Sequence, residues 1–198
     1  MMRPSPAPGL VVVGASLGGL TAIQEILRAL PEEMEVPIAI AQHRHRDSGA
    51  ALADVLQQST PVPVADAEDS EPIRPGRIYL APPDYHLLVE RTCFRLSKEG
   101  PVHYSRPSID VLFESAADSF GPGLVGIVLT GANDDGAAGS ARIRQKKGRV
   151  LVQDPATAEA PAMPRAAVAA GADRVLSLAE IARWLAWHCA RSDHDRRD

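Results

Sequence analysis

Residues 10–20, with the sequence LVVVGASLGGL, contain the pattern that decides the fold of this chain. An apolar run over 10–13 leads directly into Gly-x-Ser-x-Gly, and a helical apolar pattern follows at once. This order is typical of a strand, a sharp turn and a helix with a serine, here Ser16, at the apex. The free N–H groups of a helix start can stabilise an oxyanion or bind a phosphate. The turn is therefore compatible with a nucleophile and with a phosphate-binding site.

Strand-like and helical segments alternate along the rest of the chain. Apolar runs predict strands at 10–14, 36–41, 77–81, 87–90, 93–97, 124–130 and 149–153. Helices are predicted from Leu20 to a stop at Pro31, after a cap at Asp47-Ser48, over 108–119, over 136–147, and from the capping box at Ser177 to about Ala190. The alternation predicts an α/β fold with a doubly wound, mostly parallel sheet and flanking helices. Only two residues separate 87–90 from 93–97, which predicts one β-hairpin, and the proline-rich stretch 61–75 is expected to be a connection around a weak strand.

The composition is that of an ordinary globular domain. At 198 residues and 45% hydrophobic content, we expect a single domain over 10–190, with a disordered lead-in at 1–9 and a disordered tail at 191–198. The net charge of −4 gives no sign of the basic surface that nucleic-acid binding usually needs. No apolar run approaches the length that a membrane-spanning helix requires. The two cysteines imply no disulfide framework, which favours a cytoplasmic location.

Polar residues follow three of the predicted strands. Ser16 follows the first strand, His43 follows the second, and the run Asn133-Asp134-Asp135-Gly136 follows a later one. Because ligands of open parallel sheets bind at the carboxyl ends of the strands, these side chains should share one edge. A hydroxyl, an imidazole and a carboxylate are the groups that acyl transfer needs, and the N–H groups of Leu17 and Gly18 are candidate oxyanion donors. The order Ser…His…Asp differs from that of the α/β-hydrolases.

Less specific interpretations exist for each of these residues. The Ser16 turn could bind a dinucleotide, but Ser16 replaces the second glycine of that fingerprint, and the second strand ends without its acidic residue. His43 and His45 could form a metal pair, but a third ligand would have to come from Asp84 or His86, so we expect no metal and no cofactor.

Other residues have ordinary structural interpretations. One aspartate of the pair at 134–135 is expected to cap a helix, and Ser108 and Asp110 are expected to cap the helix over 108–119. Packing is expected for both cysteines and both tryptophans (Cys93, Cys189, Trp184 and Trp187).

Seven segments, in order along the chain, resemble the catalytic domain of CheB-type protein-glutamate methylesterases of bacterial chemotaxis. They are VGASLGG at 13–19, Gln42-His43, IYLAPPDYHLL at 78–88, RPSIDVLFES at 106–115, LTGANDDGAAG at 129–139, Gln153-Asp154 and MPRAA at 163–167. The resemblance implies that Ser16 is the catalytic serine, His43 the histidine and Asp135 the aspartate. We place His86 near the substrate, with a structural role as the equal alternative.

The resemblance also implies an activity and a set of partners. The expected reaction is hydrolysis of glutamyl methyl esters on chemoreceptor helices, with deamidation of glutamine at the same sites. Because only nine residues precede the first strand, we expect no receiver domain in cis, and a separate receiver domain or a methyltransferase could act in trans. Leu17 and Ala132 depart from the family pattern, and they motivate the alternative of a catalytically weakened binding module.

Overall fold

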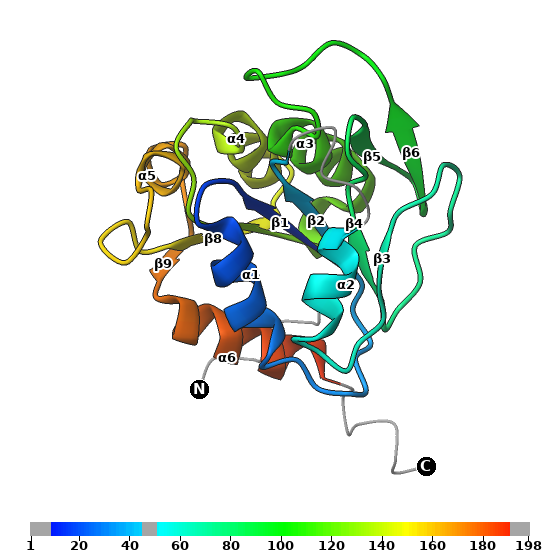
Figure 1. Ribbon diagram of the computed structural model, residues 1–198. Coiled ribbons are helices and arrows are strands. Elements are labelled where there is room, and N and C mark those ends of the chain that lie inside the picture. Colours follow the sequence, from blue (N-terminus) through cyan, green and yellow to red (C-terminus); the bar gives the residue numbers. More distant parts are fainter. Residues whose placement is uncertain (1–8, 45–50, 191–198) are drawn as a thin grey trace.

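The computed structural model describes residues 9–44 and 51–190. The expected lead-in (apart from Gly9), the cap at Asp47-Ser48, His45 and the expected tail lie outside these residues. Seven parallel strands form the central sheet in the order β3-β4-β2-β1-β7-β8-β9 (Figure 1). Their bounds are β1 Leu10–Ala15, β2 Ile38–Gln42, β3 Val64–Asp66, β4 Ile78–Leu80, β7 Leu124–Val128, β8 Arg149–Gln153 and β9 Arg174–Leu176. The prediction of a doubly wound α/β fold is confirmed.

Helices cover both faces of this sheet. The helices are α1 Gly19–Leu27, α2 Ala51–Gln57, α3 Ile109–Phe120, α4 Ala137–Gln145, α5 Ala162–Ala169 and α6 Leu178–Cys189, with a 3₁₀ turn, η1, at Gly121–Gly123. One core joins α1, α2 and α6 to one face, and a second core joins α3, α4 and α5 to the other (Figure 1). Alternation along β1 explains the division, because Val11 and Val13 lie in the first core and Leu10 and Val12 in the second.

The predicted hairpin is present as β5 His86–Glu90 and β6 Cys93–Ser97, an antiparallel pair separate from the main sheet. It packs on the same side as α3, with Leu87 and Phe94 in the second core. The ring of Phe94 lies 4.7 Å from that of Tyr79, which joins the hairpin to β4, the strand next to the edge of the sheet. The hairpin therefore covers one end of the face on which α3 lies.

Several predicted boundaries were wrong. The first helix ends at Leu27 rather than at Pro31, and the strand predicted over 124–130 ends at Val128. The sequence patterns missed α5 and β9 altogether. Pro164 stands within α5, and β9 has three residues of which two are exposed, so neither segment carries a clear periodic signal.

No helix in the described part of the chain has the length and apolar character that a membrane span needs.

Candidate active site

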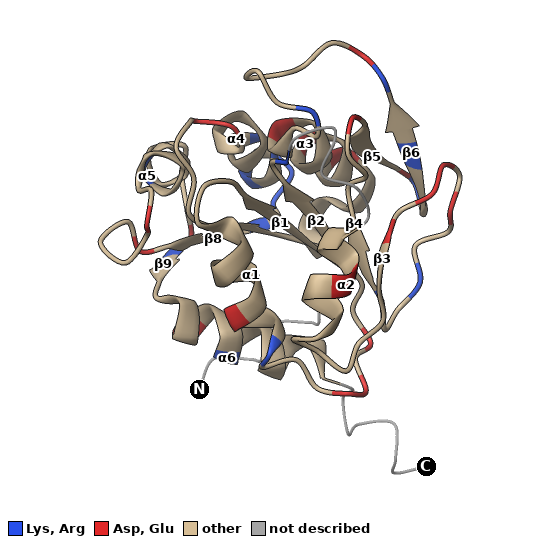
Figure 2. Ribbon diagram, viewed as in Figure 1, with Lys and Arg blue, Asp and Glu red and all other residues tan. Residues whose placement is uncertain are grey.

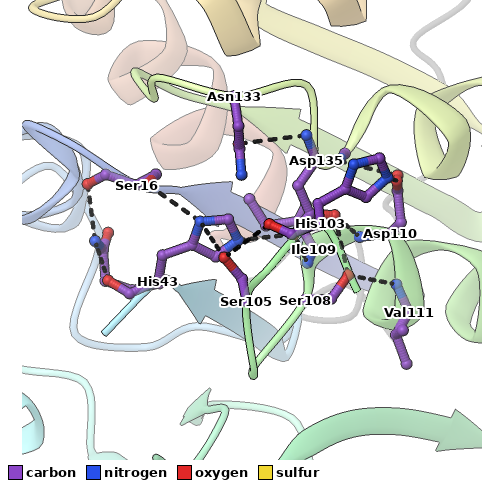
Figure 3. Close-up of polar contacts among 12 residues, drawn as sticks. Ser16, His43, His103, Ser105, Ser108, Ile109, Asp110, Val111, Asn133 and Asp135 are labelled. Carbon is purple, nitrogen blue, oxygen red and sulfur yellow. Dashed lines mark hydrogen bonds and ion pairs between the residues drawn. The ribbon is translucent and has the colours of Figure 1, made fainter. Parts of the chain in front are cut away.

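The structure brings Ser16, His43 and Asp135 into one hydrogen-bonded series (Figure 3). His43 Nδ1 lies 3.1 Å from Ser16 Oγ, and His43 Nε2 lies 2.7 Å from Asp135 Oδ2. Ser16 follows β1, His43 follows β2, and Asp135 precedes α4 after β7. Because β1 pairs with both β2 and β7, the three residues meet where neighbouring parallel strands end. The expectation that they share one edge of the sheet is confirmed.

Backbone hydrogen bonds fix the turn that carries Ser16. The N–H of Ser16 donates to the carbonyl of Thr130 at 2.9 Å, which ties the turn to the segment after β7. Gly18 takes a left-handed conformation with φ of 75°, which turns the chain into α1. The Nε2 amide of Gln42 donates to the carbonyls of Ser16, at 2.9 Å, and His43, at 3.1 Å. One side chain therefore ties the backbone of the hydroxyl-bearing residue to that of the imidazole-bearing residue.

Asp135 is completely buried, and its carboxylate accepts several hydrogen bonds. Besides His43, the donors are the backbone N–H groups of Ile109 and Asp110, each at 2.8 Å, and the hydroxyl of Ser108 at 3.0 Å. Burial alone would raise the pKa of Asp135, but the hydrogen bonds from His43, Asp110 and Ile109 lower it below its usual value. Asp135 is therefore ionised at neutral pH.

The ionised carboxylate determines which ring nitrogen of His43 carries the proton. A carboxylate without a proton can only accept, so Nε2 of His43 is the N–H donor toward Asp135. In a neutral imidazole the other nitrogen, Nδ1, then has a lone pair directed at the hydroxyl of Ser16. This arrangement allows His43 to remove the Ser16 proton and Asp135 to stabilise the imidazolium that results.

The backbone of Leu17 and Gly18 lies at the start of α1, beside Ser16. Within the described residues, the N–H groups of Leu17 and Gly18 have no hydrogen-bond acceptor. The carbonyl of Leu17 is held by the hydroxyl of Thr130 at 2.9 Å. The side chain of Leu17 is 56% exposed, so it extends into solvent. The departure from the family pattern at Leu17 therefore places an apolar side chain in solvent beside Ser16.

Two cavities meet at Ser16 and His43, which line both. The larger has a volume of about 730 Å³ and is also lined by His103, Tyr104, Ser105, Ala132 and Asn133, among others. The smaller has a volume of about 400 Å³ and is lined by the start of α1 and Gln42. Ala132, the second departure from the family pattern, is thus a small residue in the wall of the larger cavity.

His86 does not line either cavity, so of the two roles considered for it, contact with the substrate and structural support, the structure favours the second. It is 2% exposed, and its Nδ1 accepts the N–H of Ser108 at 3.2 Å while its Nε2 lies 3.1 Å from the carbonyl of Gly100. These contacts hold the segment that leads into α3. The structure therefore gives His86 a supporting place beneath the site.

The helix caps are arranged differently from the predicted ones. Ser108 caps α3 as expected, with its hydroxyl accepting the N–H of Val111. Asp110, however, accepts the N–H groups of Gly136 at 2.9 Å and Gly139 at 2.6 Å, and so caps α4 instead of its own helix. Burial raises the pKa of Asp110 to about 6, against the opposing effect of the Gly139 N–H.

Two neighbours of the site were not predicted from the sequence, and both lie in the segment between β6 and α3. Ser105 Oγ lies 3.2 Å from His43 Nδ1, nearly as close as Ser16 Oγ (Figure 3). His103 pairs with Asp134 at 3.1 Å and with Asp110 at 3.3 Å. Neither residue belongs to a periodic pattern or stands at a strand end, so only long-range structure could identify them.

One set of side chains in the described residues has the composition of a metal site. Candidate ligand atoms of His103, Asp110 and Asp135 lie within 4.8 Å of one another. Both carboxylates already accept backbone N–H groups of α3 or α4, so helix capping accounts for their convergence.

The cysteines and tryptophans only partly follow the expected packing. Cys189 is buried, and burial raises the pKa of its thiol to about 12, whereas Cys93 is only partly buried. Trp184 packs in the core and stacks on His188, but Trp187 is 78% exposed. The expected burial was therefore wrong for Cys93, and Trp187 does not show the core or edge packing expected of both tryptophans.

Comparison with known proteins identifies the family. The family described as CheB methylesterase matches residues 11–185. A putative protein-glutamate methylesterase/protein-glutamine glutaminase of Leptospira interrogans is 44% identical over 87% of this chain and 90% of the relative. Protein-glutamate methylesterase FrzG of Myxococcus xanthus is 42% identical over 90% of this chain, which spans only 54% of that relative's length.

A solved structure has the same fold. The crystal structure of the Thermotoga maritima CheB methylesterase catalytic domain matches with a TM-score of 0.87 and 30% sequence identity. The match covers 92% of this chain and 98% of that chain. By sequence and by fold, this chain belongs to the CheB methylesterase family.

Proposed function

We propose that this chain is a cytoplasmic serine hydrolase that removes methyl esters from glutamate side chains of chemoreceptors, with Ser16 as the nucleophile. The observation that carries the assignment is the series from Ser16 Oγ through His43 to the buried carboxylate of Asp135. Family membership supports the substrate class, because relatives are named protein-glutamate methylesterases. A separate receiver domain or a methyltransferase is a candidate partner in trans.

In the first half of the reaction, Ser16 Oγ attacks the ester carbonyl while His43 Nδ1 takes the hydroxyl proton. The N–H groups of Leu17 and Gly18 are placed to donate to the oxyanion that forms. As the tetrahedral intermediate collapses, the proton on Nδ1 passes to the leaving methoxide, which departs as methanol. The glutamyl group is then esterified to Ser16.

In the second half, water replaces the alcohol. His43 Nδ1 takes a proton from the water, whose oxygen attacks the acyl carbonyl, and the same proton returns to Ser16 Oγ as the bond breaks. The products are a free glutamate carboxylate and the regenerated hydroxyl. The same steps convert glutamine to glutamate, with ammonia in place of methanol, provided that His43 protonates the leaving nitrogen.

The central test compares the wild type with Ser16→Ala. Methanol release from methylated receptor fragments should be lost in this variant, and so should labelling by a fluorophosphonate probe. Ser105 is a useful reference because its hydroxyl also lies near His43, so mass spectrometry of the labelled wild type should locate the probe on Ser16 and not on Ser105. Unchanged turnover by Ser16→Ala would refute the nucleophile assignment.

A further inference from the structure

The hydroxyl of Ser105 lies at the same nitrogen of His43 as the hydroxyl of Ser16. The distances from His43 Nδ1 are 3.2 Å to Ser105 Oγ and 3.1 Å to Ser16 Oγ (Figure 3). With the proton on Nε2, Nδ1 has one lone pair, so only one of the two hydroxyls can donate to it at a time. The two hydroxyls can therefore act in different steps of the reaction.

Ser105 is poorly placed to be a second nucleophile. Its N–H donates to the carbonyl of Val102 at 2.9 Å, so this group is not free to stabilise an oxyanion. Ser16, by contrast, lies directly before the free N–H groups at the start of α1. The surroundings of Ser105 therefore suit a hydroxyl that binds a reactant and does not itself attack the ester.

Contacts with two helix starts fix the turn that carries Ser105. Val102 and Ser105 exchange two backbone hydrogen bonds, of 3.1 and 2.9 Å, across this turn. His103, inside the turn, has a positive φ of 48°, a strained conformation that persists where surrounding contacts enforce it. The enforcing contacts are its pairs with Asp110, at 3.3 Å, and Asp134, at 3.1 Å. The turn is thus attached to the starts of α3 and α4.

Arg106 closes the base of the loop that contains this turn. Its Nη1 donates to the carbonyls of Lys98, at 2.9 Å, and Glu99, at 2.8 Å. Its Nε donates to the carboxylate of Asp84 at 3.2 Å. In Figure 2 the Lys, Arg and Glu residues between β6 and α3 lie at the two ends of this segment, and residues 100–105 include none. The loop is therefore closed by its charged ends, which limits how far the turn can move.

Acylation removes one of the two hydroxyls at His43. Once Ser16 carries the acyl group, its Oγ atom has no proton to donate, and Nδ1 of His43 loses that partner. Among the described residues, Ser105 then provides the hydroxyl that remains within hydrogen-bond distance of Nδ1. Water must now bind at the same nitrogen, because a general base takes its proton across about 2.6–3.2 Å. The step that Ser105 can affect directly is therefore hydrolysis of the acyl-enzyme.

We propose that Ser105 and His43 together hold the water that hydrolyses the acyl-enzyme. Two atoms 3.2 Å apart can both lie within hydrogen-bond distance of one water oxygen. The water donates one hydrogen to Nδ1 of His43 and the other to Oγ of Ser105, whose own hydroxyl turns toward the carbonyl of His103, 3.5 Å away. Ser16, His43 and Ser105 all line the larger cavity, which has ample room for a water molecule.

The chemistry takes no proton from Ser105. The water oxygen bonds to the acyl carbon as Nδ1 of His43 takes one proton, and the tetrahedral intermediate then loses its bond to Ser16 Oγ. The proton on Nδ1 returns to Ser16 Oγ, and the second hydrogen of the water leaves with the product acid, which ionises in solvent. Ser105 changes only its hydrogen bonds. This inference rests on the proposed function, because it takes Ser16 to be acylated.

The two halves of the reaction can be measured separately with p-nitrophenyl acetate, which acetylates a serine nucleophile. Quench-flow mass spectrometry follows the appearance and the loss of the acetyl group on Ser16. In Ser105→Ala the loss should be roughly tenfold slower than in the wild type, about the effect of one missing hydrogen bond. The appearance should not be slower, because the hydroxyl that competes for Nδ1 of His43 is gone. Loss of the acetyl group at the wild-type rate would overturn the proposal.

Two controls separate loss of the hydroxyl from displacement of the loop. Ser105→Thr keeps a hydroxyl at the same position and should restore most of the wild-type rate of acetyl loss. Hydroxylamine attacks esters without a general base, so it should release the acetyl group from the wild type and from Ser105→Ala at the same rate. Equal slowing in the alanine and threonine variants, or a slower reaction of Ser105→Ala with hydroxylamine, would indicate a purely structural role and would also overturn the proposal.

The same experiment distinguishes failure of this proposal from failure of the proposed function. If no acetyl group appears on Ser16 of the wild type, and Ser16→Ala keeps full turnover, then Ser16 is not the nucleophile and both proposals fail. If Ser16 is acetylated, but Ser105→Ala loses the acetyl group as fast as the wild type does, only the role of Ser105 is wrong. Because the ester is a small molecule, neither result depends on which protein is the natural substrate.

Discussion

Asp135, which precedes α4, caps α3, and Asp110, which lies in the first turn of α3, caps α4. The carboxylate of Asp135 accepts the N–H groups of Ile109 and Asp110 at the start of α3, and the carboxylate of Asp110 accepts those of Gly136 and Gly139 at the start of α4. Free N–H groups at each helix N-terminus therefore find an acceptor on the neighbouring helix segment, which supports both helix starts. The carboxylate that orients His43 is consequently part of the packing of two helices.

Asp135→Asn should lower kcat by about 10⁴, the loss seen when a triad carboxylate becomes an amide. The amide can donate to His43 Nε2, which would stabilise the tautomer that has no lone pair toward Ser16. Methanol release under saturating substrate measures the effect. Asp134→Asn is the control, since the side chain of Asp134 is 68% exposed and the expected change is within about threefold. The reverse ranking of the two variants would mean that Asp134 is the catalytic carboxylate.

Asp110→Asn should change how stability depends on pH. The folded-state pKa of Asp110 is raised to about 6 from an ordinary value of 3.8, so the folded protein holds this proton more tightly than the unfolded chain does. Ionisation of Asp110 therefore lowers stability as pH rises from about 4 to 6. The free energy of unfolding of Asp110→Asn, relative to wild type, should accordingly increase between these pH values in urea titrations.

Asp118→Asn gives the opposite sign and serves as the control for this experiment. The hydrogen bond from Lys146 and the nearby charge of Arg142 lower the pKa of Asp118, so its ionised form favours folding. Its replacement should become slightly more destabilising as pH rises toward about 4 and should stay constant above that, by under about 1 kcal/mol for an exposed pair. A pH-independent difference between Asp110→Asn and wild type would contradict the interpretation of Asp110.

Ser105→Ala should accelerate the reaction of Ser16 with a fluorophosphonate probe. Two hydroxyls, those of Ser16 and Ser105, lie 3.1 and 3.2 Å from the single lone pair of His43 Nδ1. Removing the competing donor should raise the labelling rate about fivefold, the equivalent of one neutral hydrogen bond of about 1 kcal/mol. Ser97→Ala in β6 is the control, because its hydroxyl accepts only the N–H of Glu99 among the described residues. Slower labelling of Ser105→Ala would show that Ser105 supports His43 instead of competing for it.

Gly14→Ala should destabilise the protein by about 1–3 kcal/mol, the usual cost of overpacking. A Cβ at this position in β1 would overlap the side chain of Ile109 at the start of α3. Chemical denaturation measures the change, with Gly100→Ala as the control because no heavy atom lies within 4 Å of its added Cβ. Equal stability of the two variants would contradict the close packing of β1 against α3.

The positions of Ser16 and His43 could be predicted because they depend on local signals. Each follows a strongly apolar strand, and parallel strands bring their carboxyl ends to one edge. The choice of Asp135 over Asp134 came from the family pattern, and the structure places the carboxylate of Asp135 against His43. Strand-end placement alone does not distinguish two adjacent aspartates.

The parts that could not be predicted depend on contacts between distant segments. Asp110 was expected to cap α3 because a polar residue in a first turn ordinarily caps its own helix. Its carboxylate instead accepts the N–H of Gly136 at the start of α4, 26 residues further along the chain. The short strand β9 and the eight-residue helix α5, which has Pro164 in its first turn, carry weak periodicity, and tertiary packing forms them. His103 and Ser105 stand in an irregular loop, where no pattern relates them to His43.

The order of the strands along the chain also determines when, during synthesis, the site of Ser16, His43 and Asp135 can form. Ser16 and His43 lie near the N-terminus, while Asp135 is 92 residues after His43, and β1 completes its pairing only with β7. A nascent chain that ends before β7 carries the hydroxyl and the imidazole without the carboxylate or the strand that hold them in place. Domains fold as units as they leave the ribosome. Esterase chemistry should therefore arise only after synthesis has passed Asp135, when β7 has paired with the first strand.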